Sequence, residues 1–315
     1  MTAENLSRRS FMKHVSLTTA AALAGTHLPQ SLATESNAGL HVACNSYSWY
    51  AYYQREGKDF YADIDAGLAE VAAAGLDGYE PGIGKAGDID NLISPLKKHN
   101  LQMRSIYIGT TLHDRDKAKD SIRNVLAIAE KAKVAGTSII VTNPDPLSWE
   151  SGQAKTDDQL KVQSEMLNTL GEKLKGMGVT LAYHNHNMEL KNAAREFHHV
   201  MLGTDPANLS LCLDAHWIYR GSGDSQVSLF DILKLYGERV SELHLRQSQD
   251  GVWTETFTDG DIDYGRLIDN LLSLKVKPHL VVEQAPENGT PKTMSAREAL
   301  TMSTEYTRKI FARFA

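Results

Sequence analysis

The chain has 315 residues, of which 42% are hydrophobic and 23% are charged, a composition typical of a soluble globular protein with a sizeable core. Its formal net charge is −6, which excludes the basic surface that nucleic-acid-binding proteins usually present to phosphates. No segment reaches the ~20 consecutive apolar residues that a membrane-spanning helix needs. We therefore expect neither a nucleic-acid partner nor a membrane span.

The first 33 residues have the features of an export signal. Arg8 and Arg9 form a twin-arginine pattern, a mildly apolar run follows at residues 15–23, and small residues at 31–33 offer a cleavage site. A disordered basic tail would account for the charges but not for this order of regions. We therefore predict that residues 1–33 are a twin-arginine signal peptide recognised by the twin-arginine export machinery. The location is then periplasmic or otherwise exported.

From residue 34 onward, short apolar runs alternate with longer segments of helical periodicity. Between residues 117 and 134, for example, apolar side chains recur with the 3.6-residue spacing of one helix face. The predicted strands span residues 41–46, 78–80, 103–108, 138–142, 180–184, 209–214, 241–246 and 279–283. The predicted helices include residues 61–74, 117–134, 158–177, 229–236, 265–274 and 296–314.

Eight strands that alternate with helices imply a parallel sheet, and eight is the number that closes a barrel. The alternative, an open doubly wound sheet, normally has a glycine-rich phosphate-binding turn after its first strand. Here residues 45–49 follow the first strand without a glycine. We predict one α/β domain over residues 34–315, a single (β/α)₈ TIM barrel. Cys44 and Cys212 fall in strands and are expected to be buried free thiols, with a disulfide as the alternative.

Ionisable side chains end several of the predicted strands, and in a barrel these carboxyl ends open on one face. Adjacent strands lie about 4.8 Å apart, so such side chains can converge on one ion. Any one of them alone is more simply a hydrogen-bonded structural residue, but several together need a compensating cation. Mixed carboxylate and imidazole ligands favour Mn²⁺, Zn²⁺, Co²⁺ or Fe²⁺. The strand-terminal residues are Glu80, His184, Asp214, His244 and Glu283.

The chain resembles the xylose-isomerase-like TIM-barrel superfamily of sugar isomerases and epimerases over residues 40–314. The resemblance rests on the motifs at residues 183–189, 213–217, 244–246 and 282–283. It implies one divalent metal held at the ends of the fifth to eighth strands, usually by Glu, Asp, His and Glu. Asp214, His244 and Glu283 match the last three positions. His184 occupies the place of the first Glu, and Glu189 follows five residues later, so both are candidate ligands.

The resemblance also implies roles for residues around the metal. Relatives commonly have His-Leu-Lys-Asp at the seventh strand, whereas this chain has Arg and Gln at the last two positions, so Arg246 is expected to bind a substrate oxygen or carboxylate bidentately. The candidate bases are Glu189 and Glu283, and the candidate proton shuttles are His186 and His216. The other candidate substrate-binding residues, of which the aromatic ones fit a core position equally well, are Asn45, Glu80, Tyr107, Trp217 and Trp253.

These features predict a divalent-metal-dependent sugar isomerase or epimerase that removes a proton beside a metal-polarised carbonyl. The alternatives are a lyase or dehydratase that uses the same enediolate, and a non-catalytic carbohydrate-binding barrel. An endonuclease IV-like phosphodiesterase is disfavoured by the acidic charge balance. Export favours a non-phosphorylated sugar or keto-sugar as the substrate. The sequence leaves the oligomeric state open, a homo-oligomer included.

Overall fold

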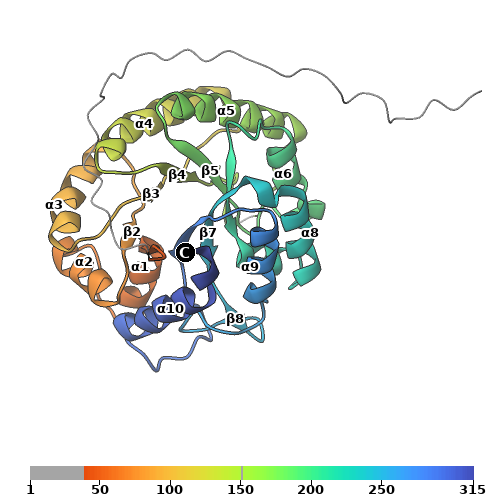
Figure 1. Cartoon of the computed structure of the whole chain (residues 1–315). Coiled ribbons are helices and arrows are strands. Elements are labelled where there is room, and N and C mark those ends of the chain that lie inside the picture. The colour runs from red at the N-terminus through yellow and green to blue at the C-terminus, as the bar shows by residue number, and fades with distance from the viewer. Residues whose placement is uncertain (1–38, 150–151) are drawn as a thin grey trace, which may run out of the picture. The chain divides into compact units, whose positions relative to one another are not determined.

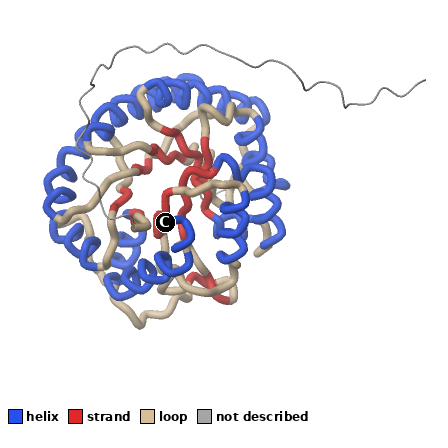
Figure 2. Tube along the Cα trace, in the orientation of Figure 1, coloured by secondary structure: helices blue, strands red, loops and turns tan. Residues whose placement is uncertain are grey.

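Parallel strands form an inner ring and helices form an outer ring in the computed structural model, which describes residues 39–149 and 152–315 (Figures 1 and 2). The unit Gly39–Ala315 is compact, and the predicted signal peptide lies outside the described residues. The barrel strands are β1 (Val42–Asn45), β2 (Gly78–Glu80), β3 (Ser105–Tyr107), β4 (Ile139–Thr142), β5 (Thr180–His184), β6 (Ser210–Asp214), β7 (Val240–Leu245) and β10 (His279–Val282).

Helices follow the strands and cover the outside of the barrel (Figure 1). The α-helices are α1 (Ser46–Arg55), α2 (Ile64–Ala73), α3 (Asp90–Lys98), α4 (Arg115–Val134), α5 (Asp157–Gly176), α6 (Lys191–Leu202), α7 (Ala215–Gly221), α8 (Gln226–Tyr236), α9 (Tyr264–Ser273) and α10 (Ala296–Ile310). Short 3₁₀ helices are η1 (Ala86–Ile89), η2 (Gly237–Arg239) and η3 (Ala312–Phe314). The six predicted helical segments are confirmed; α1, α3, α6 and α7 were not among them.

The sheet closes between its two end strands. Its order is β2-β1-β10-β7-β6-β5-β4-β3, and the backbone of Tyr79 donates to the Gln102 carbonyl oxygen at 2.9 Å to join the β2 and β3 segments. A second bond runs from the Tyr107 N–H to the Pro81 carbonyl oxygen, also at 2.9 Å. A Cβ at Gly78 would lie 2.7 Å from that Gln102 oxygen, so glycine is what lets the two segments approach. The predicted eight-stranded parallel barrel is therefore confirmed.

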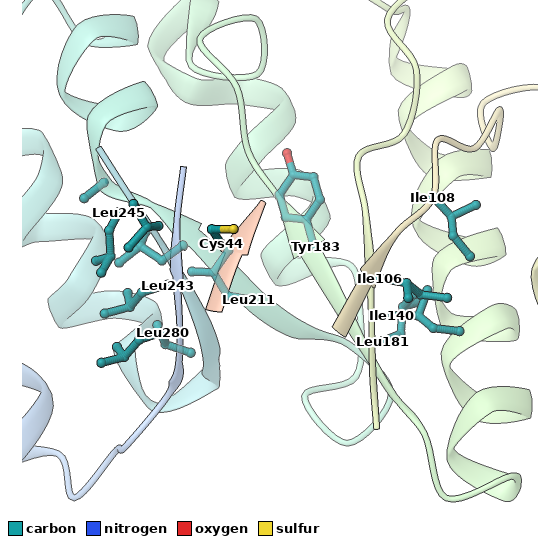
Figure 3. Packing of buried hydrophobic residues seen from close by; sticks show 14 of the residues in the cluster. Cys44, Ile106, Ile108, Ile140, Leu181, Tyr183, Leu211, Leu243, Leu245 and Leu280 are labelled. Atoms are coloured by element: carbon teal, nitrogen blue, oxygen red, sulfur yellow. The ribbon is translucent and has the colours of Figure 1, made fainter. Parts of the chain in front are cut away.

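Side chains alternate between the two faces of each strand, as the pleat requires. The outward side chains pack under the helices and form the main hydrophobic core, in which Figure 3 shows Ile106, Leu181 and Leu243. Inside the barrel, the buried apolar cluster consists of Val141, Ala182 and Cys212. Much of the remaining interior is polar and ionisable. Both cysteines are buried and free, as expected.

A short hairpin extends the barrel mouth after β7. Its strands β8 (Ser248–Gln249) and β9 (Val252–Trp253) pair antiparallel across Asp250 and Gly251, whose φ angles are +53° and +78°. Such Asp-Gly turns suit the right-handed twist of a hairpin. Asp261 accepts hydrogen bonds from both turn N–H groups, at 3.0 and 2.9 Å, and so fixes the hairpin. Within the described part of the chain, no helix is long and apolar enough to cross a bilayer.

Candidate active site

Four of the five predicted metal ligands lie together at the carboxyl ends of β5, β6, β7 and β10. Glu283 Oε2 is 2.9 Å from His244 Nδ1 and 3.6 Å from His184 Nε2. Asp214 Oδ2 is 3.9 Å from His184 Nε2, and the β6–β7 register places Asp214 beside His244. We call His184, Asp214, His244 and Glu283 the ligand group.

The ligand group fits a divalent cation. Ligand atoms ~2.1 Å from a tetrahedral ion are about 3.4 Å apart; the ligand atoms of His184, His244 and Glu283 all lie within 4.8 Å of one another, and Asp214 Oδ2 lies 3.9 Å from His184 Nε2. Both ring nitrogens of His184 and Asp214 Oδ2 are buried without a hydrogen-bond partner. An orphaned buried polar atom costs about 1–3 kcal/mol, so atoms of this kind call for a ligand. The chemistry of the donors and their spacing therefore agree.

The pKa values of the two carboxyl groups in the ligand group shift in opposite directions, upward for Asp214 and downward for Glu283. Burial raises the pKa of Asp214, although Arg246 opposes this. Burial would also raise the pKa of Glu283, but Arg246 and then His244 hold it well below its ordinary value. Glu283 is therefore ionised at neutral pH.

The ring of His244 is oriented from below by two acidic side chains. Its Nε2 lies 3.1 Å from Glu80 Oε1 and 3.3 Å from Glu242 Oε1, and Glu242 Oε2 lies 2.9 Å from His279 Nδ1. When Nε2 carries the proton and donates it to a carboxylate, the Nδ1 lone pair is free to bind an ion. Glu242 was not predicted, yet it precedes His244 by two strand positions, and period-two alternation alone places both inside the barrel.

A cavity of about 450 Å³ opens above the ligand group. The predicted residues Asn45, Tyr107, His186, Trp217 and Arg246 line it, together with Glu283 from the ligand group. The lining residues that were not predicted are Ser46, Tyr47, Gly82 and Trp149. Tyr47 follows the first strand and Trp149 the fourth, so both belong to the loops and helix starts that form the active face of such barrels.

Outside the ligand group, four predicted residues do not line the cavity: Glu80, Glu189, His216 and Trp253. Glu189 accepts hydrogen bonds from Asn143 Nδ2 at 3.0 Å and from the His186 N–H at 2.7 Å, so its carboxylate is engaged outside the ligand group. His216 lies 2.9 Å from the Ser248 hydroxyl, and its burial, followed by the charge of Arg246, lowers its pKa to about 2. Glu80 lies beneath His244 and accepts from Asn45 Nδ2.

We expect Glu189→Gln to alter how stability depends on pH. Burial, followed by repulsion from Glu196, raises the pKa of Glu189 from 4.5 to about 7. A folded-state pKa above the unfolded value means that stabilisation by the protonated acid is complete below pH 4.5 and is lost as the pH rises through 7. Gln stays neutral at every pH. The free energy of unfolding of the variant minus that of the native protein should therefore rise by roughly 2–3 kcal/mol as the pH increases from 4.5 to about 7. Urea unfolding between pH 5 and 8 without metal measures this, and parallel curves would contradict it.

Comparison with known proteins is consistent with this arrangement. The model of the family described as xylose isomerase-like TIM barrel matches residues 68–306. An inosose dehydratase of Clostridium perfringens is 26% identical over 245 residues, which cover 69% of this chain and 80% of the relative.

Solved structures share the fold at lower identity. An L-ribulose 3-epimerase superposes with a TM-score of 0.65 at 18% identity, covering 87% of this chain and 95% of the other. A 3-keto-D-glucoside 4-epimerase of E. coli gives 0.61 at 14%, with coverage of 87% and 98%. A xylose isomerase-like barrel from Mycobacterium smegmatis in complex with magnesium gives 0.65 at 14%, with coverage of 87% and 97%.

Proposed function

Because the chain belongs to the xylose isomerase-like TIM barrel family, we propose that it is a divalent-metal-dependent enzyme that removes a proton beside a carbonyl of a non-phosphorylated sugar or keto-sugar. The observation that carries the proposal is the ligand group, with its orphaned buried atoms, directly beneath a cavity of about 450 Å³. Among the described residues that line this cavity, Arg246 alone has a fixed positive charge, which favours a substrate without a phosphate group.

A divalent ion held by His184, Asp214, His244 and Glu283 would supply Lewis-acid polarisation of a substrate carbonyl. Glu283 is ionised and lines the cavity, so it is placed to accept the proton from the carbon beside that carbonyl. The C–H electron pair then stays on the substrate as an enediolate. His186 also lines the cavity, and burial, followed by the charge of His184, lowers its pKa, so its neutral ring is a second proton acceptor.

The fate of the enediolate separates the candidate reactions. Return of the proton to the other face of the same carbon gives an epimer, and return to the neighbouring carbon gives an isomer. Loss of a β-hydroxyl, with a proton delivered to it, releases water and gives a dehydratase product. Similarity in sequence to inosose dehydratase supports the last reaction, whereas the epimerase neighbours support the first.

The proposal is tested by incubating the Mn²⁺-loaded protein in D₂O with inososes and keto-sugars. Deuterium uptake with a new stereoisomer, followed by NMR, supports an epimerase or isomerase. Loss of water with a new enone absorbance supports a dehydratase. Binding by calorimetry without deuterium uptake identifies a non-catalytic carbohydrate-binding barrel, and a preference for sugar phosphates contradicts the substrate class.

The non-phosphorylated substrate also agrees with the export that we propose for residues 1–33. Sugar phosphates are scarce outside the cytoplasm, so an exported enzyme would meet free sugars and glycosides. Fractionation of cells that produce the full chain tests this part: accumulation in the cytoplasm with residues 1–33 intact would contradict it.

We expect Glu242→Gln to weaken metal binding about 10- to 100-fold, because it removes a carboxylate that holds His244 with Nδ1 toward the ligand group. Calorimetric titration with Mn²⁺ measures the dissociation constant. Glu255→Gln is a matched control, since Glu255 is also buried but binds Thr293 and Arg55 away from the cavity. Equal affinities in the Glu242 variant and the native protein would contradict the positioning role.

A further inference from the structure

One guanidinium nitrogen of Arg246 has no hydrogen-bond partner. Its Nε donates to the Glu283 carbonyl oxygen at 3.1 Å, and Nη2 lies 3.1 Å from Glu283 Oε2. Nη1 is buried and has no partner, although the side chain is only 1% exposed and lines the cavity. An arginine that is needed only to pair with Glu283 would not leave a buried donor unsatisfied. Because Nε and Nη2 contact Glu283, Nη1 is the guanidinium nitrogen left for a substrate oxygen.

The guanidinium is also held in place by aromatic rings at the barrel mouth. The Arg246 Cζ lies 4.1 Å from the Trp253 ring centre and 5.1 Å from that of Trp217, within range for cation–π attraction. Trp253 is fixed in turn: its indole N–H donates to His216 Nδ1 at 3.3 Å, and its backbone N–H donates to Glu287 Oε1 at 2.8 Å. Glu287 itself forms a two-bond ion pair with Arg220. A donor fixed in this way is preorganised, and such donors stabilise charge without rearrangement.

The charges around the cavity indicate which charge the substrate atom that accepts a hydrogen bond from Arg246 Nη1 should carry. The charge of a divalent ion would be balanced by the carboxylates of Asp214 and Glu283, which leaves Arg246 in excess by one positive charge. Among the described residues that line the cavity, Arg246 thus presents the one fixed positive charge, and its unpartnered Nη1 favours an acceptor with a negative charge.

We propose that Arg246 Nη1 binds a negatively charged oxygen of the substrate, which makes the site selective for an anionic oxygen beside the carbonyl. This rests on the proposed function for the identity of the reaction. The charge has two sources: a carboxylate already present on the substrate, or the oxygen that becomes negative when the proton leaves. Both accept the same charge-assisted hydrogen bond.

Binding of two matched small chelators tests the proposal without turnover. Glycolate and glycolamide have the same shape, but only glycolate is charged. Against the Mn²⁺-loaded protein, Arg246→Met should weaken glycolate binding about 10- to 100-fold and change glycolamide binding less than about threefold. Calorimetry gives both constants, and titration with Mn²⁺ checks that metal affinity is kept. An equal loss for both chelators, or no loss for either, overturns the proposal.

A second variant tests the proposal if Arg246→Met does not fold. Trp253→Phe keeps the arginine but loosens the ring that holds it, and it should weaken glycolate more than glycolamide. If the proposal is wrong, this variant will weaken both chelators alike or neither.

Kinetics distinguish the two sources of charge. If the partner is a substrate carboxylate, Arg246→Met raises KM for an acidic keto-sugar much more than KM for a neutral one. If it is the developing oxyanion, the variant lowers kcat about 10²- to 10³-fold on a neutral keto-sugar and leaves KM unchanged. Unchanged kcat and KM on both substrates overturns the proposal. If the native protein turns over no sugar, the proposed function fails, while chelator selectivity still decides the role of Arg246.

Discussion

Asp214→Asn is expected to stabilise the metal-free protein and to abolish metal binding at the same time. Asp214 Oδ1 accepts a hydrogen bond from the Trp217 N–H at 2.9 Å, a bond that Asn keeps. Oδ2 is buried without a partner, so the substitution replaces an orphaned acidic oxygen by a neutral amide of the same shape. We expect the metal-free free energy of unfolding to rise by about 1–2 kcal/mol and the affinity for Mn²⁺ to fall at least ~100-fold.

Urea unfolding in the presence of a chelator gives the first quantity, and calorimetric titration with Mn²⁺ gives the second. Asp261→Asn is the matched control, because Asp261 accepts hydrogen bonds from Ser248, Asp250 and Gly251. This control should lose stability, since both of its oxygens are used. If Asp214→Asn also loses stability and still binds Mn²⁺ normally, Asp214 is a structural residue and the ligand group is misassigned.

Glu283→Gln is expected to lower kcat about 10³- to 10⁴-fold even when metal is saturating. Among the four ligand-group residues, Glu283 alone lines the cavity, and Arg246 and His244 keep it ionised despite its burial. Gln has the same size but cannot accept a proton from carbon. Its amide oxygen is also a weaker ligand, so the Mn²⁺ affinity should fall as well.

Turnover of the Glu283 variant is therefore measured over a range of Mn²⁺ concentrations that reaches saturation. Deuterium exchange at the carbon beside the carbonyl should stay suppressed throughout. Recovery of kcat at high Mn²⁺ would show that Glu283 is only a ligand, and it would move the role of base to His186.

The barrel could be predicted because its determinants are local. Each strand is a short apolar run followed by a periodic helix, and the strand ends at His184, Asp214 and His244 lie at the same face by construction of the fold. The hairpin at Asp250 and Gly251 also had a local signal, an Asp-Gly pair between two short strands. The same reasoning, applied with period-two alternation along β7, would have included Glu242.

The environments of Glu189 and His216 depend on contacts that the sequence order does not contain. Glu189 is bound by Asn143, which comes from the end of a different strand 46 positions earlier. His216 follows Asp214 by two residues, but α7 begins at Ala215, so strand alternation no longer applies to its side chain. Trp149 reaches the cavity from a loop without periodicity. Their environments follow from tertiary packing, which spacing alone does not specify.

The position of the join between β2 and β3 affects how the barrel would respond to metal binding. The ligand group ties together β5, β6, β7 and β10, which are consecutive in the sheet, whereas the join lies on the opposite arc of the ring. A bound ion would therefore directly stabilise the side of the barrel formed by β5, β6, β7 and β10. The other arc contributes Asn45 and Tyr107 to the cavity and is linked to the ligand group through Glu80, which lies 3.1 Å from His244 Nε2, so we expect metal binding to restrain the cavity wall there less directly.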